Sequence, residues 1–176
     1  TIDITTHGSI ELNLDTSVRA ASPSFSIAGV FARSTGGTGE ASEDNSDPGG
    51  RGEEGRPITL INTGEIIVNA PYLTEAYTDG AFSAAMFALS EGGDGGASPN
   101  KNVGGAGGGA AVNTSGAVSK VQVSSEASSK IDTTGYGIMG MAALARGGDG
   151  GDGNGASNSA GGAGGRGADI LLEAGE

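Results

Sequence analysis

The stretch Gly29-Val30-Phe31-Ala32-Arg33-Ser34-Thr35-Gly36-Gly37 recurs along this chain and is the basis of the fold that we predict. It returns at residues 85–93 as AMFALSEGG and at residues 140–148 as GMAALARGG. Measured between the double glycines that end them, successive copies are 56 and 55 residues apart. A nearly constant period of this length is typical of repeat proteins, in which each unit packs against its neighbours.

A second motif keeps the same period. Residues 4–10 (ITTHGSI), 60–66 (LINTGEI) and 112–118 (VNTSGAV) share an apolar residue, three further residues, a glycine, one residue and a second apolar residue; the motif begins again at 171–175. This pattern predicts two short strands joined by a glycine turn. Each unit is therefore expected to contain strand, turn, strand, connector, a strand that ends in the double glycine, and an insert.

We therefore predict an all-β fold, a parallel β-helix of about three repeats that covers residues 1–176 as one solenoid segment. Equivalent residues should stack in ladders, with Val30 over Met86 over Met141. The chain begins inside one unit and ends inside another, so we expect it to be part of a longer repeat array. An antiparallel β-sandwich of about eight short strands is the alternative.

The chain has three glycine-rich inserts, residues 36–55, 92–109 and 147–167; the second and third run largely as Gly-Gly-x, and the first is polar and acidic. A period of three matches the three residues per turn of polyproline II and polyglycine II chains. With two glycines per turn, neighbouring backbones can approach closely and exchange hydrogen bonds while the third residue points to solvent. We therefore predict stacked polyglycine-II-like hairpins; a flexible glycine linker is the alternative.

The composition agrees with a thin core. The chain has 36 glycines among 176 residues, no cysteine or tryptophan, and 35% hydrophobic residues. Its formal charge of −12 argues against nucleic acid as a partner, because phosphates are bound by Lys and Arg. No apolar run of about 18 residues is present, so we expect no transmembrane helix.

One surface feature follows from the strand pattern. Phe31, Phe87, Leu89 and Leu144 alternate with the residues that we place in the core, so they should form an exposed apolar stripe unless something covers them.

Few residues suggest catalysis. His7 is the single histidine and falls in a predicted turn, so we expect a surface residue. The acids of the predicted strands and connectors are scattered rather than paired as glycoside hydrolysis requires: Asp3, Glu11, Glu65 and Glu75. We therefore predict no enzyme activity, with a polysaccharide-acting β-helix enzyme as a distant alternative.

Calcium is the main chemical alternative. Residues 147–152 (GGDGGD) match the start of the calcium-binding nonapeptide Gly-Gly-x-Gly-x-Asp, which makes Asp149 and Asp152 candidate metal ligands. The match does not recur in tandem, and Asn154 stands where that repeat needs a large apolar residue. The acidic loop from Glu40 to Glu54 could also take up Ca²⁺ weakly, since that ion prefers oxygen ligands. Apart from this ion we expect no cofactor.

The double-glycine strand resembles the passenger repeats of large glycine-rich autotransporters, which carry Gly-Ile-x-Ala-x-Ser-x-Gly-Gly. The matching residues are Gly29, Val30, Ala32, Ser34, Gly36 and Gly37 in the first copy and Ala85, Met86, Ala88, Ser90, Gly92 and Gly93 in the second. In the third copy Ala145 replaces the hydroxyl residue. The resemblance implies a β-helical, extracellular protein of the bacterial cell surface that is exported by type V secretion, and it contributes no catalytic residues.

These observations lead to one functional hypothesis. We expect a non-enzymatic structural or adhesive repeat segment of a bacterial cell-surface or filament-forming protein. Its partners would be neighbouring repeats or identical chains along a rod or fibre, with surface glycans or other cells as adhesive ligands. A calcium-binding repeat module of a secreted protein is the alternative, and an ice-binding glycine bundle a more distant one.

Overall fold

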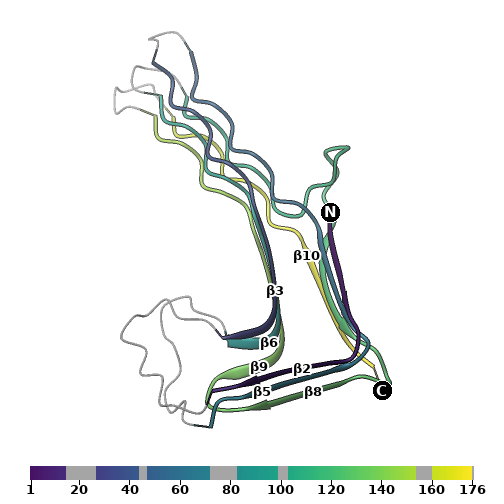
Figure 1. The fold of residues 1–176 in the computed structure, drawn as a ribbon. Helices are drawn as coiled ribbons and strands as arrows, with labels where there is room; N and C mark the ends of the chain where they lie inside the picture. Colours follow the sequence, from purple (N-terminus) through teal and green to yellow (C-terminus); the bar gives the residue numbers. More distant parts are fainter. Residues whose placement is uncertain (15–26, 44–46, 72–82, 99–102, 154–159, 176) are drawn as a thin grey trace.

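The computed structural model describes residues 1–14, 27–43, 47–71, 83–98, 103–153 and 160–175. These residues form ten β-strands and no helix, arranged in three sheets (Figure 1). Sheet A contains β1 (Ile2–Thr6), β4 (Ile58–Asn62), β7 (Lys120–Ser125) and β10 (Asp169–Ala174). Sheet B contains β2 (Ser9–Asn13), β5 (Glu65–Asn69) and β8 (Lys130–Thr134), and sheet C contains β3 (Ala28–Thr35), β6 (Ser83–Glu91) and β9 (Ile138–Arg146).

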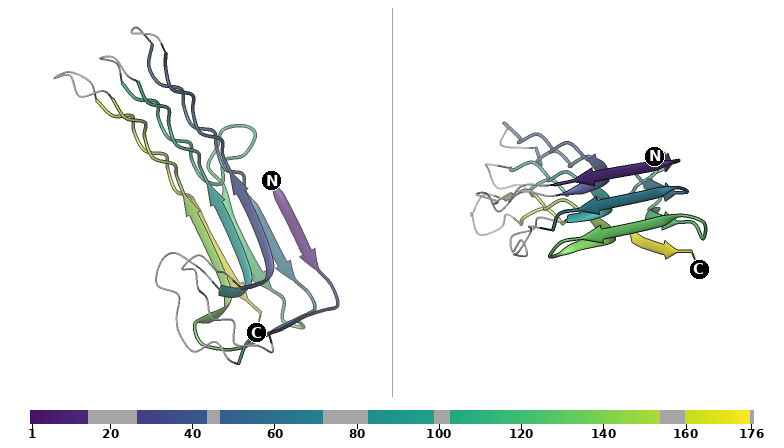
Figure 2. Two further views of the ribbon diagram at one scale, coloured as in Figure 1. Left: turned by 60° about the vertical axis from the view of Figure 1, so that its left-hand side comes forward. Right: turned by 60° about the horizontal axis from the view of Figure 1, so that its bottom comes forward.

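Consecutive strands lie in different sheets, because each repeat contributes one strand to sheet A, one to sheet B and one to sheet C. Every strand pairs in parallel with its counterpart in the next repeat, so that Ile2 lies beside Ile58 and Ile10 beside Ile66. Successive repeats therefore lie on one another in layers, a solenoid-like arrangement (Figure 2). The predicted all-β repeat of parallel strands is confirmed, and the antiparallel sandwich is wrong.

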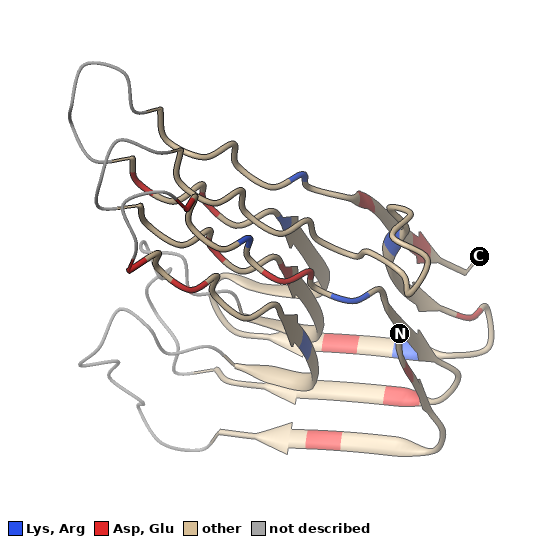
Figure 3. Ribbon diagram, turned by 90° about the horizontal axis from the view of Figure 1, so that it is seen from above, with Lys and Arg blue, Asp and Glu red and all other residues tan. Residues whose placement is uncertain are grey.

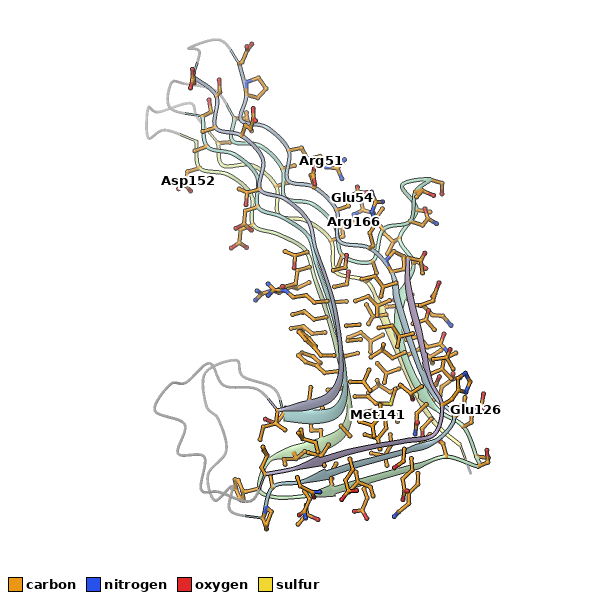
Figure 4. All side chains as sticks on the ribbon, viewed as in Figure 1. Arg51, Glu54, Glu126, Met141, Asp152 and Arg166 are labelled. Atoms are coloured by element: carbon orange, nitrogen blue, oxygen red, sulfur yellow. The ribbon has the colours of Figure 1, made fainter. Side chains whose placement is uncertain are left out.

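The core lies between the sheets, where the side chains of all three point toward one another (Figure 4). Val30, Met86 and Met141 occupy paired positions on neighbouring strands, as predicted. The large fully buried side chains come from the inner layers of the stack: Ile58, Leu60, Ile66, Val68, Met86, Val121 and Val123. Their counterparts at the two ends of the stack are only partly buried, because each has a neighbouring layer on one side.

The corner between sheets A and B is held by a buried amide rather than by apolar packing. Asn62 is fully buried. Its Oδ1 accepts hydrogen bonds from the Gly64 amide at 3.1 Å and from Thr6 Oγ1 at 3.0 Å. Its Nδ2 donates to the carbonyls of Gly64 and Lys130, at 3.2 and 3.3 Å. One side chain thus joins three successive layers where the chain leaves the ladder of sheet A.

The third copy of the turn motif was predicted in the wrong place. Residues 112–118 form a local loop, in which Val112 and Val118 make an isolated antiparallel bridge. The Asn113 side chain closes this loop by accepting hydrogen bonds from the amides of Ser115 and Ala117. The third repeat instead uses β7 and β8, and the corner between them contains no glycine; there the Ser129 amide donates to the Glu126 carbonyl at 2.9 Å.

The predicted apolar stripe is only partly exposed. Phe31 is 51% exposed, whereas Phe87 is 5% exposed and its ring stacks on that of Phe31 with centroids 5.3 Å apart. Leu89 and Leu144 are half-buried beside Phe87. Phe87 is therefore covered by its neighbours along sheet C, and Phe31 at the end of the sheet stays exposed.

Candidate functional site in the glycine inserts

Three pairs of extended arms project beyond the sheets from the ends of β3, β6 and β9 (Figures 1 and 2). The outgoing arms are residues 36–43, 92–98 and 147–153. The return arms, residues 47–55, 103–110 and 160–167, lead back to sheet A. The tips of the predicted inserts, residues 44–46, 99–102 and 154–159, lie outside the described residues.

Arms of the same kind are hydrogen-bonded from layer to layer at every third residue. Gly36 and Gly39 donate to the carbonyls of Glu91 and Asp94, and the next layer repeats the pattern from Gly95 to Asp149. The return arms do the same: their donors are Gly49, Gly52 and Gly55 in the first layer and Gly104, Gly107 and Ala110 in the second. The inserts therefore continue the layers of the sheets outward with the same period.

Outgoing and return arms are also hydrogen-bonded to each other, through residues that directly follow donors of this first set. Gly93 donates to Glu53 of the layer before it, and Gly108 of its own layer donates back to Gly93, each at 2.8 Å. Gly148 of the third layer then donates to Gly108 at 3.0 Å. The six arms thus form one continuous hydrogen-bonded array, which we call the glycine lattice.

The lattice leaves no space for side chains in its interior. A Cβ atom on Gly92 would lie 1.8 Å from the Gly108 carbonyl oxygen, and one on Gly105 would lie 1.8 Å from that of Gly50. Both obstacles are backbone atoms, which cannot rotate away. Glycine is therefore required at these positions by the close approach of the arms rather than by an unusual backbone conformation.

Each third residue points outward and carries the chemistry of the surface. In the middle insert Asp94 and Ala97 are exposed, while the glycine pairs beside them are buried. Asp152 projects on the outgoing side, whereas Arg51, Glu54 and Arg166 project on the return side (Figure 4). Charged residues accordingly occur along the arms and on the strands of sheet B (Figure 3).

Serine hydroxyls tie the two arms together at the base of the first two inserts. Ser90 is fully buried; its Oγ accepts from the Ala111 amide and donates to the Arg56 carbonyl, both at 2.9 Å. Ser34 Oγ accepts from the Arg56 amide at 2.7 Å. Ala145 occupies the same ladder position in the third layer and has no hydroxyl. This position therefore links the end of a sheet C strand to the start of the next coil.

A buried carboxylate braces the outgoing arms. The Glu91 side chain is 6% exposed and is paired with Arg33 at 2.9 Å and with Arg146, which come from the layers on either side. These residues line a depression of about 280 Å³ with Asp94 and Asp149. Because both arginines are ion-paired with Glu91, the cluster joins three layers and neutralises the buried carboxylate. The two guanidinium groups are therefore not available as a free pair to bind an anion.

Asp149 and Asp152, the predicted calcium ligands, lie three residues apart on the third outgoing arm and are both exposed. The Asp149 amide donates to Asp94 Oδ1 of the second layer at 2.8 Å. Among the residues that the structure describes, no group of three or more His, Cys, Asp or Glu residues is placed to hold a metal ion. Calcium binding at these aspartates stays a prediction.

The other titratable residues singled out by their sequence lie on different elements. His7 is exposed, with Nδ1 2.7 Å from Thr63 Oγ1. Asp3 lies on β1 and Glu11 on β2, and Glu75 is outside the described residues. Lys130 pairs with Glu65 at 3.1 Å and with Asp132 at 3.5 Å on sheet B; its hydrogen bond to Glu65 and the charges of both acids raise its pKa above the ordinary value.

Two sets of residues in the lattice were not predicted. The tie made by Ser90 was visible only as a recurring hydroxyl at residues 34 and 90. Glu40 and Glu53 lie where the other inserts have glycine, and the sequence by itself identifies them only as part of an acidic loop. Their departure from the Gly-Gly-x phase was the available signal.

Comparisons with protein-family models, with curated proteins and with solved structures gave no match for this chain. The described residues also contain no helix that is long and apolar enough to cross a membrane.

Proposed function

We propose that this chain is a non-enzymatic structural segment of a rod- or filament-forming protein of the bacterial cell surface, built as a parallel β-helix with polyglycine II inserts. The observation that carries the proposal is the period-three hydrogen bonding of the glycine lattice, which runs through all three layers. That period equals the three residues per turn of polyglycine II. Interiors without side chains have no room for a substrate, so the lattice is suited to holding layers together.

The geometry supports a mechanical role. Each repeat adds one strand to every sheet, which lengthens the stack by about 4.8 Å. It also adds one pair of arms, and an arm of seven or eight polyglycine II residues reaches roughly 20–25 Å. A long array would therefore be a rod along one side of which the glycine lattice continues. Hydrogen bonds between layers, both in the three sheets and in the glycine lattice, would resist separation of the repeats.

The residues on the surface of the glycine lattice are consistent with contact with solvent and with other molecules. Its outward third residues include acids and arginines, and the chain has a net charge of −12, which favours solubility and keeps neighbouring rods apart. Neighbouring repeats are the proposed partners along the axis, and cell-surface glycans are the proposed ligands of the outward residues. The resemblance to autotransporter passengers supports export to the bacterial surface.

Electron microscopy of the native material tests the proposal. We expect rods or fibres whose lateral face carries a regular projection, and diffraction from aligned material with a spacing of about 4.8 Å along the axis. Isolated compact particles without that axial spacing would refute it. Melting with and without EDTA separates the calcium alternative: the structural proposal expects the same midpoint in both, whereas a calcium-dependent module would unfold in EDTA.

A further inference from the structure

The two outer faces of the glycine lattice differ in the residues that they present. We call the outer side of the first insert the first face and the outer side of the third insert the last face. The first face presents two glutamates, Glu40 and Glu53, and both are exposed. The last face presents Gly161, Gly164 and Gly167, which are exposed as well.

Two glycines of the last face, Gly161 and Gly164, are not required by the packing of this chain, whereas a Cβ on Gly167 would lie 3.2 Å from the Ala145 carbonyl oxygen. A Cβ on Gly164 would lie 3.8 Å from its nearest neighbour, and one on Gly161 would lie 3.6 Å away, both ordinary contacts. At the equivalent positions of the second layer, Gly107 and Gly104, it would lie 2.1 and 1.8 Å from a carbonyl oxygen of the third insert. Glycine loses more conformational entropy on ordering than any other residue. Its retention on the last face therefore indicates a further backbone that packs there.

The backbone polar groups of this face point to the same kind of occupant. Gly104 and Gly107 donate to the carbonyls of Ala160 and Ala163 in the third layer. Within the described ranges, the amides of Gly161 and Gly164 have no such acceptor. A row of amides with this spacing matches the carbonyls that another Gly-Gly-x arm presents at every third residue.

The end of the apolar core is uncovered on the same side of the molecule. Ile170 and Leu172 end the ladders of sheet A and are 45% and 47% exposed. Their partners one layer inward, Val121 and Val123, are fully buried. The last face is thus continuous with an apolar strand edge, and both continue an interface that already exists between the inner layers.

The first face cannot receive the same occupant. In the second layer, Gly96 and Gly108 hold the positions of Glu40 and Glu53, and a Cβ on them would lie 1.9 and 1.8 Å from a carbonyl oxygen of the layer before. The glutamate side chains of a layer like the first would therefore collide with any glycine layer placed before it. The same collision excludes head-to-tail stacking of a second copy of this chain in this register.

We propose that the last face binds a further repeat whose insert has glycine at the positions of Gly93, Gly96, Gly105 and Gly108. The first face does not bind such a repeat. The glycine lattice can then be extended in one direction only. Glutamate side chains prevent a further layer from packing on the first face, whereas the exposed backbone of the last face allows it. This inference rests on the structural function proposed above and adds to it the chemistry of the partner and the direction of assembly.

Hydrogen exchange of glycine amides tests the proposal. In the chain itself, Gly161 and Gly164 should exchange at least tenfold faster than Gly104 and Gly107. In a chain in which residues 63–111 are repeated after Ala174, the position aligned with Asn62, the added insert should slow Gly161 and Gly164 at least tenfold. Unchanged exchange in the longer chain would overturn the proposal.

Two matched variants of the longer chain give the control. One carries Gly96→Glu and Gly108→Glu in the repeated segment only, which copies the glutamates of the first insert, and it should leave Gly161 and Gly164 unprotected. The other carries Gly161→Ala and Gly164→Ala on the receiving face and should leave the added insert unprotected. Protection equal to that of the parent in either variant would refute docking through this face. Protection in the longer chain combined with no rods in the microscope would refute assembly into rods while leaving the docking face intact.

Discussion

Replacing Gly108 by alanine should destabilise the chain although it adds a single methyl group. The new Cβ would lie 1.8 Å from the Glu53 carbonyl oxygen, so the second return arm must move away from the first. That movement weakens three hydrogen bonds: Gly108 to Gly93, Gly93 to Glu53 and Gly148 to Gly108. At about 1 kcal/mol each, the loss is about 3 kcal/mol.

Alanine also restricts the unfolded chain, which offsets about 0.4–1 kcal/mol of this loss. The expected net cost is therefore about 2 kcal/mol, which lowers the melting temperature by roughly 4–8 °C for a chain of this length. Thermal unfolding followed by circular dichroism measures the shift, and hydrogen exchange shows whether the glycine amides lose protection first.

Gly164→Ala is the matched control, because it makes the same chemical change in the same kind of arm. The nearest atom to its Cβ would be 3.8 Å away, and neither glycine has a φ in the left-handed region. We expect its melting temperature to be unchanged or slightly raised. Equal melting temperatures for Gly108→Ala and Gly164→Ala would refute the argument that close approach of the arms requires glycine.

Three further predictions concern side chains around the lattice and the sheets. Ser90→Ala leaves a buried amide and a partly buried carbonyl without their partner, and urea unfolding should show a loss of about 1–3 kcal/mol. Asn62→Ala removes the amide that joins three layers at a buried corner, so it should cost at least as much, and a loss below 0.5 kcal/mol would contradict that role. Lys130, whose pKa is raised by Glu65 and Asp132, should add stability that is present below pH 10.5 and lost as the pH rises through the raised pKa; the stability of Lys130→Met should not show this fall.

The repeat and its ladders could be predicted because they depend on local patterns. The alternation of residues 29–37 and its return after 56 residues placed Val30, Met86 and Met141 on one face and in successive layers, and the strands pair in that register. The two glycines in every three residues of the inserts likewise indicated arms that approach backbone to backbone. Such patterns are visible in the sequence because each repeat packs against repeats of the same kind.

The misplaced corner at residues 112–118 shows where local patterns fail. An apolar residue, a glycine and another apolar residue at this spacing occur in both a strand corner and a closed loop. The side chain of Asn113 stabilises the loop, because its Oδ1 accepts hydrogen bonds from the amides of Ser115 and Ala117. The real corner, between β7 and β8, has no glycine to mark it, so the motif pointed to the wrong segment.

The amino-acid order alone predicted the period and the strand faces and favoured ordered glycine arms over a flexible linker, because these follow from residue spacing and side-chain size. It could not specify which glycines are buried, why Glu40 and Glu53 are tolerated, or that Phe87 is covered while Phe31 is not. Those properties depend on the position of a layer within the stack, since the same arm is crowded on both sides in the middle and open on one side at an end. Stacking in three dimensions therefore gives identical motifs different surroundings, and with them different roles.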